Sequence, residues 1–459
     1  MFYIYSWKGQ LMRILKIQFR FGLISLFLIL GQKYSLAQEL VFSAVPSYSQ
    51  TFKNNVQLAI NEHPRAAAAI AMREEQKYIE DEARSALYPQ IGVDLSGRHR
   101  FADNYEDRFD NITQRSLRET AANVSLTGRQ LIYDGGSTFS RISSARYAFT
   151  AAHEEYALET SAIALAATEA HYHMLLQKVR KEYHHENVSR HREILDMVNQ
   201  RFESGRGANQ DVTLMESRLA LAETRAFRVE MDLEEAISNY EEIYNFSPAN
   251  IKRPEFSMGL PNSENDALQM GFLNSPLIVM ASSRTLASKE DVSAMKRERL
   301  PSLSLELSAT KYDLERGNPD YDVTGRLVLN YSLYNGGASN ARISRTKKGY
   351  ERQRYLEDNI HREVNRGIKV SYQSMESQKR QVITLKKSME ASGINRDQTR
   401  EQFEMMGGNL FSLLEAAREH HSAREQHLGG MIEYELSKFR LLDAMGTLLP
   451  ALNILLQKG

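Results

Sequence analysis

Two hydrophobic patterns alternate along the chain, and each of them occurs twice. In the first pattern apolar residues stand at every second position, as in Ile91, Val93 and Leu95. A period of two is typical of half-buried β-strands, in which successive side chains point to opposite faces. It predicts four strands in two hairpins, one over residues 89–133 and the other over residues 301–334.

A charged helical stretch precedes each hairpin and is stopped by a proline. Residues 65–87 lead to Pro89, and residues 277–300 lead to Pro301. Proline has no backbone N–H and clashes with the preceding turn, so it cannot continue a helix. We therefore expect each hairpin to begin directly after its proline.

A very long helix is expected after each hairpin. Residues 137–204 contain neither Gly nor Pro, and at 1.5 Å per residue these 68 residues make a helix of ~100 Å. The corresponding segment of the second half, residues 338–406, contains no Pro. Average helices have only about 11 to 12 residues, so spans of this length indicate coiled-coil packing rather than a compact globule.

A glycine-rich turn follows each long helix, and a second helix runs back beside it. The returning helices are expected over residues 209–246 and 410–449. In the first of them, apolar residues spaced by seven form an a/d seam over five heptads, which predicts packing against the long helix. The two series are Val212, Leu219, Ala226, Leu233 and Tyr240, and Met215, Ala222, Val229, Ala236 and Ile243.

The two halves of the chain share one plan. The sequence LIYDGG at Leu131–Gly136 resembles SLYNGG at Ser332–Gly337, 201 residues later. Phe202-Glu203 recurs as Phe403-Glu404 at the same offset. Such internal similarity predicts two structural repeats. The expected division is a first repeat over residues 38–246, a connector over 247–263 and a second repeat over 264–459.

The first 37 residues have the pattern of a secretory signal peptide. Basic residues precede an apolar run over residues 21–30, and a small-residue cleavage pattern ends at Ala37. The apolar run is shorter than the ~20 residues of a transmembrane helix, so we expect cleavage, with a retained anchor as the alternative. Met1 and Met12 are both candidates for the true start.

Composition narrows the possible classes of protein. Lys and Arg number 58, as do Asp and Glu, and a net charge of zero argues against a nucleic-acid-binding protein. Cys is absent, which removes disulfides, Cys-ligated metals, thiol nucleophiles and a lipidated N-terminal Cys. A mean hydropathy of −0.48 excludes a polytopic helical membrane protein. The expected leader contains five bases and no acid, so its removal leaves a charge of −5.

Four strands with one apolar face cannot close a barrel within one chain. An open sheet edge in lipid leaves backbone groups without partners, and the smallest bacterial barrels have ~8 strands. Several copies must therefore combine their hairpins. The order of elements, given twice, resembles that of the TolC-like outer membrane efflux proteins. It consists of a Pro-terminated helix, a hairpin, an aromatic-[Asp/Asn]-Gly-Gly sequence, a long helix, a Phe-x-x-Gly-type turn and a returning helix.

This resemblance implies an α+β membrane protein of the Gram-negative outer membrane. Three chains of a homotrimer would form one transmembrane β-barrel, continuous with a periplasmic tunnel of long helices. The implied function is a passive exit duct, with no cofactor, in either multidrug efflux or type I secretion of polypeptides. The implied partners are a periplasmic adaptor protein, an inner-membrane ABC or proton-driven exporter and outer membrane lipid, without nucleic acid. The rival hypothesis is an exported coiled-coil adaptor or adhesin that has no channel.

The resemblance also places a gate at the two helix turns, which would form the periplasmic mouth. Family members close this mouth with bonds between neighbouring turns and with acidic rings. Asp211 matches the acidic latch position, but Phe403 lacks the hydroxyl of its Tyr counterpart and Gly408 stands where a latch Arg can occur. Of the two acidic-ring positions, Ser412 is uncharged and Glu415 keeps a charge. We therefore expect closure mainly by helix packing, and weaker block by cations. The expected gate and adaptor-contact residues are Phe202, Gly205, Gly207, Asp211, Phe403, Gly407, Gly408, Ser412 and Glu415.

The two Gly-Gly pairs are expected to be strand–helix junctions. Asp134 and Asn335 would cap the long helices, and the glycines would allow a tight bend. No Lys-Ser/Thr follows either pair, so neither is a phosphate loop. The expected junction residues are Pro89, Asp134, Gly135, Gly136, Pro301, Asn335, Gly336 and Gly337.

Twelve histidines, six of them from His153 to His191, raise the question of a metal site. No two of them are three or four residues apart, the spacings that place two ligands on one helix face. We therefore expect solvated or seam-lining histidines and no metal. HExxH, GxSxG and Cys are also missing from the sequence, so we do not expect an enzyme.

Overall fold

The computed structural model describes residues 48–102, 120–249, 251–254, 259–314, 320–406 and 408–456. The expected signal peptide and the expected turn residue Gly407 lie outside the described residues.

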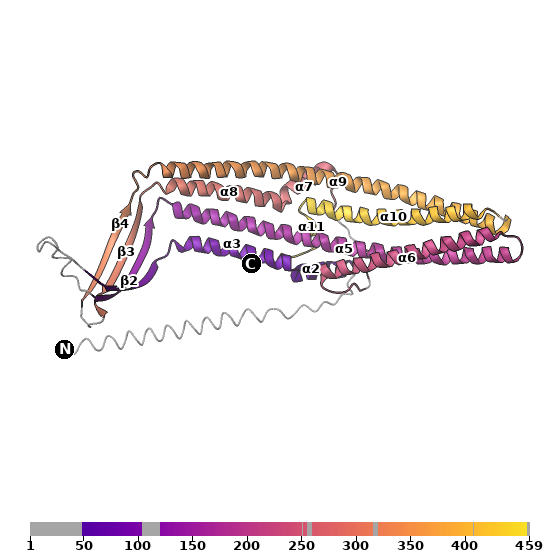
Figure 1. Cartoon of the computed structure of the whole chain (residues 1–459). Helices are drawn as coiled ribbons and strands as arrows, with labels where there is room; N and C mark the ends of the chain where they lie inside the picture. Colours follow the sequence, from indigo (N-terminus) through magenta and orange to yellow (C-terminus); the bar gives the residue numbers. More distant parts are fainter. Residues whose placement is uncertain are drawn as a thin grey trace, which may run out of the picture. The chain divides into compact units, whose positions relative to one another are not determined.

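The described chain consists of long helices and one four-stranded sheet, in an order that is given twice (Figure 1). The first repeat contains α2 (Tyr48–Glu62), α3 (Pro64–Ser85), β1 (Gln90–His99), β2 (Thr120–Tyr133), α5 (Ser137–Glu203) and α6 (Asn209–Tyr244). The second contains α7 (Glu264–Asn274), α8 (Pro276–Arg297), β3 (Ser302–Lys311), β4 (Tyr321–Asn330), α9 (Ala338–Met406), α10 (Leu410–Ala444) and α11 (Leu448–Ala451).

Each repeat opens with two helices, where the sequence pattern predicted one. Pro64 and Pro276 are the first residues of α3 and α8, a position at which the missing N–H costs nothing. The residue before each proline is extended, which separates the second helix from α2 or α7. The side chain of His63 caps α3 by accepting a hydrogen bond from the Arg65 backbone N–H at 3.2 Å.

The returning helix of the second repeat ends at Ala444, not at residue 449 as expected. Gly446 interrupts it with a φ of +71°. A Cβ at this position would lie 2.6 Å from the carbonyl oxygen of Asn274, so only glycine fits. The chain then continues into the short helix α11.

The four strands form one antiparallel sheet in the order β1-β2-β3-β4. Opposed residues share a face, and the two faces differ sharply in polarity. One row of the apolar face is Val93, Leu126, Ala309 and Val323. The adjacent row, on the polar face, is Asp94, Ser125, Thr310 and Asp322. The sheet therefore has the alternation that the sequence predicted.

Strand β4 is shorter than the apolar alternation suggested. The alternation continues to Leu333, but β4 ends at Asn330, where it pairs with Ser302 at the start of β3. Pro301 precedes Ser302 and has no N–H to donate, so the ladder has no hydrogen bond with which to continue.

The main hydrophobic core lies between the long helices, where α5 packs against α6, α8, α3 and α10, and α9 packs against α8 and α10. Ala164, Ala167 and Ala170 of α5 line this core and permit close approach. Tyr244 donates a hydrogen bond from its hydroxyl to the Ala167 carbonyl at 2.9 Å. The largest fully buried side chains include Phe52, Tyr172, Tyr240, Tyr244 and Phe439.

His171 is one of the histidines that line a helix seam, as expected. It is 2% exposed, and its Nε2 lies 2.9 Å from the Lys252 carbonyl oxygen. A carbonyl can only accept, so Nε2 carries the proton and donates it. Burial lowers the pKa of His171 to about 4, because the charged ring would lose its hydration.

No helix in the described part of the chain combines the length and the apolar character needed to cross a membrane.

Candidate gate at the helix turns

One turn joins α5 to α6, and another joins α9 to α10. Figure 1 shows both turns at the end of these helices that lies away from the sheet. The turn of the first pair covers residues 204–208, and the described residues of the second turn are Gly408 and Asn409. Most residues predicted for the gate lie on these turns or within two helical turns of them.

Backbone conformation and close contacts favour glycine in these turns. Gly205 has a φ of +74°, and its N–H bonds the Phe202 carbonyl oxygen at 2.9 Å. A Cβ at Gly207 would lie 3.0 Å from the backbone nitrogen of Phe202. A Cβ at Gly408 would lie 3.3 Å from the backbone nitrogen of Phe403. Gly207 and Gly408 occupy equivalent positions of the two repeats, so the same close approach to an aromatic residue is built twice.

The helices that leave the turns begin differently. Asn409 caps α10, because its side-chain oxygen accepts from the Phe411 N–H at 2.8 Å. Ala208 at the start of α6 has no side-chain cap. Asp211 stands in the first turn of α6, where a carboxylate interacts favourably with the positive end of the helix dipole.

A small hydrophobic cluster, here called the tip cluster, joins the two helix pairs. Its buried members are Ile194, Val198, Met215, Phe403, Leu410, Leu413 and Leu414. Phe403 is only 3% exposed within it, whereas its repeat counterpart Phe202 is 45% exposed. The tip of α9 is therefore inserted against the first pair, and the corresponding aromatic residue of α5 is not inserted.

Arg201 adds a polar connection to the tip cluster. Its guanidinium carbon lies 4.0 Å from the centre of the Phe403 ring, and its Nη2 donates to the Phe403 carbonyl oxygen at 2.5 Å. One side chain thus makes a cation–π contact and a charge-assisted hydrogen bond across the two turns. Sequence reasoning missed Arg201, because no local pattern links two residues 202 positions apart.

The acidic positions predicted for the mouth have unlike surroundings. Asp211 is half-buried, and its carboxylate has no ion pair within the described residues. Ser412 is exposed and uncharged. Glu415 is exposed and forms an ion pair with Arg418, whose Nε lies 3.1 Å from Glu415 Oε2. This hydrogen bond, together with the charges of Arg418 and Arg218, lowers the pKa of Glu415. The charge predicted at Glu415 is therefore balanced within the chain.

The first strand–helix junction, at the start of α5, is closely packed. Asp134 accepts hydrogen bonds from the N–H groups of Gly136 at 3.0 Å and Thr138 at 2.6 Å. Gly136 is the N-cap residue of α5, and the Asp134 carboxylate satisfies an N–H group of the first helical turn. Gly135 has a φ of +68°, and a Cβ there would lie 2.7 Å from Leu300 Cβ. Arg297 closes the junction from α8 by donating to the Gly136 carbonyl oxygen at 3.1 Å.

The second junction has the same plan with weaker contacts. Asn335 accepts from the Ser339 N–H at 3.3 Å, so it also caps its helix. Gly336 and Gly337 have φ values of +65° and +86°, but a Cβ at either would meet nothing within 4 Å. Pro89 and Pro301 each follow a short turn at the end of α3 or α8 and directly precede a strand. All eight expected junction residues therefore lie at strand–helix boundaries.

The chain matches one family over most of its length. Residues 55–239 and 267–447 match the sequence profile described as outer membrane efflux protein. The chain is 20% identical over 421 residues to the outer membrane efflux protein BepC of Brucella suis biovar 1 (strain 1330), which covers 91% of this chain and 87% of that protein. It is 22% identical over 396 residues to the outer membrane protein TolC of Salmonella enteritidis, with coverage of 82% and 79%.

Solved structures support the same fold. The outer-membrane channel OprN superposes with a TM-score of 0.75 at 16% identity, covering 86% of this chain and 90% of that one. The CmeC outer membrane channel of Campylobacter jejuni has a TM-score of 0.74 at 14% identity, with coverage of 90% and 91%.

Proposed function

Since the chain belongs to the outer membrane efflux protein family, we propose that three copies of it form the outer membrane duct of a tripartite export system. Family membership confirms the TolC-like resemblance and the location in the Gram-negative outer membrane. It also assigns the chain to a family of efflux channels rather than enzymes. The trimer, its gate and its partners are the parts that we propose.

The open sheet is the observation that carries the proposal. Its apolar face is exposed to about the same degree on both edge strands, with Val93 at 71% and Val323 at 69%. Strands β1, β3 and β4 have 10 residues each, the length that crosses a bilayer when tilted. If the β1 edge of one chain pairs with the β4 edge of the next, three sheets close into a barrel with lipid outside and a polar lumen inside.

The long helices fit the wall of a tunnel in the periplasm. Helices α5 and α9 have 67 and 69 residues, or ~100 Å each. Their seams pack on neighbouring helices, and much of the remaining surface is charged and exposed. A passive duct needs an energised inner-membrane exporter, of the ABC or proton-driven type, and an adaptor protein that contacts the helix turns. Its cargo would be drugs or secreted polypeptides.

The tip cluster is the proposed closing element of the mouth. Phe403 and Arg201 connect the second helix pair to the first by packing and by a cation–π contact. Glu415 is already paired with Arg418, and Ser412 carries no charge, so the acidic ring is weak. We therefore propose closure by packing, and a weaker block by cations than a fully acidic ring would give.

Cysteine cross-linking tests the trimer directly, because the chain contains no native Cys. Within one chain β1 and β4 are separated by two strands, or about 14 Å, which is too far for a disulfide. Asp94→Cys on β1 is combined with Asp322→Cys, Thr324→Cys or Arg326→Cys on β4. At least one pair should give disulfide-linked trimers in outer membranes.

Ser125→Cys on β2 combined with Asp322→Cys on β4 is the matched control. Strand β2 is covered by β1 and β3, so this pair should not cross-link between chains. A monomer in detergent-solubilised outer membranes, with no cross-link from any β1–β4 pair, would refute the proposed assembly. That result would favour the rival hypothesis of an exported coiled-coil protein without a channel.

A further inference from the structure

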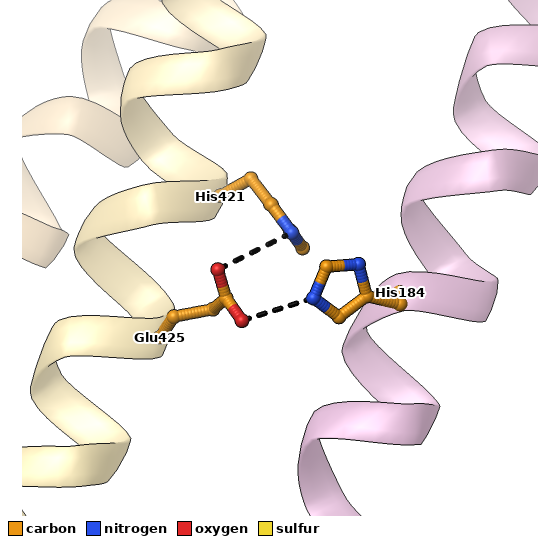
Figure 2. Close-up of side chains that lie close together, drawn as sticks. All are labelled: His184, His421 and Glu425. Carbon is orange, nitrogen blue, oxygen red and sulfur yellow. Dashed lines mark hydrogen bonds and ion pairs between the residues drawn. The ribbon is translucent and has the colours of Figure 1, made fainter. Parts of the chain in front are cut away.

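A cluster of three potential metal ligands lies between the two repeats, on α5 and α10. His184 is on α5, and His421 and Glu425 are four residues apart on α10 (Figure 2). A spacing of four places His421 and Glu425 on the same face of their helix. Figure 2 shows both side chains directed toward His184.

Both histidines of the cluster are largely buried, and each has a ring nitrogen without a hydrogen-bond partner among the described residues. His184 is 5% exposed, and the side chain of His421 is 11% exposed. Nδ1 of His184 and Nε2 of His421 are buried and unpaired among the described residues. A buried polar atom of this kind costs ~1–3 kcal/mol. Nε2 of His421 is the unpaired atom that faces Glu425, so it is the one that a bound ion would satisfy.

The distances in the cluster suit a small metal ion. Nε2 of His184 lies 2.9 Å from Glu425 Oε1, and Nε2 of His421 lies 3.7 Å from Glu425 Oε2. One ligand atom from each residue lies within 4.8 Å of the others. In a tetrahedral site with bonds of about 2.1 Å the ligand atoms are about 3.4 Å apart. The three side chains would need to approach by about 1.4 Å at most to reach this spacing.

The chemistry of the donors selects the class of ion. Two imidazoles and one carboxylate are typical ligands of Zn²⁺ sites that keep a fourth position open. Mg²⁺ and Ca²⁺ prefer oxygen ligands. We propose that His184, His421 and Glu425 bind one divalent transition-metal ion of the Zn²⁺ type, which links α5 to α10.

A cavity of about 20 Å³ borders His421, and its lining includes His191, His420 and Ile194 but neither His184 nor Glu425. Its volume is about that of one water molecule. A water ligand of the proposed ion would enter from the side of His421.

Charged neighbours of the cluster are balanced, which limits repulsion of a cation. Arg180 lies 3.3 Å from Glu425 Oε1, but it also lies 3.9 Å from Asp232. Arg424 forms an ion pair with Glu186 at 2.6 Å. Each arginine thus has a carboxylate other than Glu425. Arg180 contacts Oε1 of Glu425, so the proposed ion would compete with Arg180 for this oxygen. Oε2 of Glu425 stays available to the ion.

The proposed ion would connect the two repeats, since α5 belongs to the first and α10 to the second. Binding of this ion would not depend on the cargo or on the exporter. An isolated chain would bind the ion as well as an assembled one. Metal binding therefore tests the proposal without any assumption about transport.

The experiment measures metal binding by the full mature chain in detergent, purified without a polyhistidine tag and stripped with EDTA. Zn²⁺ is titrated against a competing chromophoric chelator, and Co²⁺ is used as a spectroscopic probe. We expect one Zn²⁺ per chain and the intense visible absorption of four-coordinate Co²⁺. His184→Ala and His421→Ala should each weaken binding by at least about tenfold, since even residues that only support a ligand contribute 10–100-fold.

His185→Ala is the matched control, because His185 neighbours His184 but its side chain is 55% exposed and lies beside Glu230. It should bind Zn²⁺ like the unchanged chain. Glu425→Gln keeps the shape of the side chain and serves if an alanine variant does not fold, as judged by circular dichroism and gel filtration. Absence of Zn²⁺ binding, or equal binding by the unchanged chain, His421→Ala and Glu425→Gln, would overturn the proposal.

Discussion

Truncating Phe403 should open the periplasmic mouth, because this ring is the largest side chain of the tip cluster. It is 3% exposed, and truncating a buried Phe to Ala typically costs ~3–5 kcal/mol. The Arg201 guanidinium would also lose its cation–π partner, which adds ~0.5–1 kcal/mol. At 1.4 kcal/mol for each factor of ten, a loss of about 3 kcal/mol shifts the closed-to-open equilibrium by roughly a hundredfold.

Single-channel recording in planar bilayers measures this shift. Phe403→Ala should raise conductance and the time spent open. Phe202→Ala is the matched control, because it removes the equivalent ring of the first repeat, which is 45% exposed. Its conductance should stay near that of the unchanged channel. Low conductance in Phe403→Ala, combined with a release of conductance by Asp211→Ala, would show that a carboxylate latch closes the mouth and that the packing argument is wrong.

Three further predictions concern single side chains. The free energy of unfolding should fall as the pH drops from 6.5 to 4, because the unfolded chain binds a proton on His171 that the folded chain excludes. The full contribution of His171 is about 3 kcal/mol. Burial also lowers the pKa of His421 to about 4, so His171→Gln should reduce, but not remove, the pH dependence of thermal unfolding in this range. Asp134→Ala should lower the free energy of unfolding by ~1–2 kcal/mol and speed hydrogen exchange at the start of α5. Asn335→Ala should affect the start of α9 less, because the hydrogen bond from the Ser339 N–H to Asn335 is longer, at 3.3 Å. Equal effects of the two substitutions would contradict this difference between the caps. Gly135→Ala should lower the melting temperature more than Gly336→Ala, because only the Cβ at Gly135 meets Leu300; a thermal scan in detergent compares them, and the reverse order would disprove the steric argument.

Local patterns in the sequence predicted the elements that are determined by local physics. The period of two at Ile91, Val93 and Leu95 marked β1, and the absence of Gly and Pro marked α5. The end of α10 was placed too late because apolar residues continue past it. The constraint at Gly446 comes from its contact with Asn274, which is distant in sequence.

Contacts between repeats could not be predicted in the same way. Arg201 meets Phe403, and His184 meets Glu425, only because α5 packs against helices of the second repeat. One signal was present: His421 and Glu425 have the spacing of two ligands on a helix face. The spacing of histidines alone does not show it, because the second residue of the pair is a glutamate.

Equivalent positions of the two repeats have taken different roles, and this difference bears on the gate. Phe403 is buried and Phe202 is exposed, although Gly207 and Gly408 approach their backbones in the same manner. Residue 402, the counterpart of Arg201, is an exposed Gln and cannot make the cation–π contact. The cation–π contact is therefore made in one direction only, by an arginine of α5 with an aromatic ring of α9. Because the second pair is held by the first through this contact, we expect the α9–α10 turn to be the part that moves when the mouth opens.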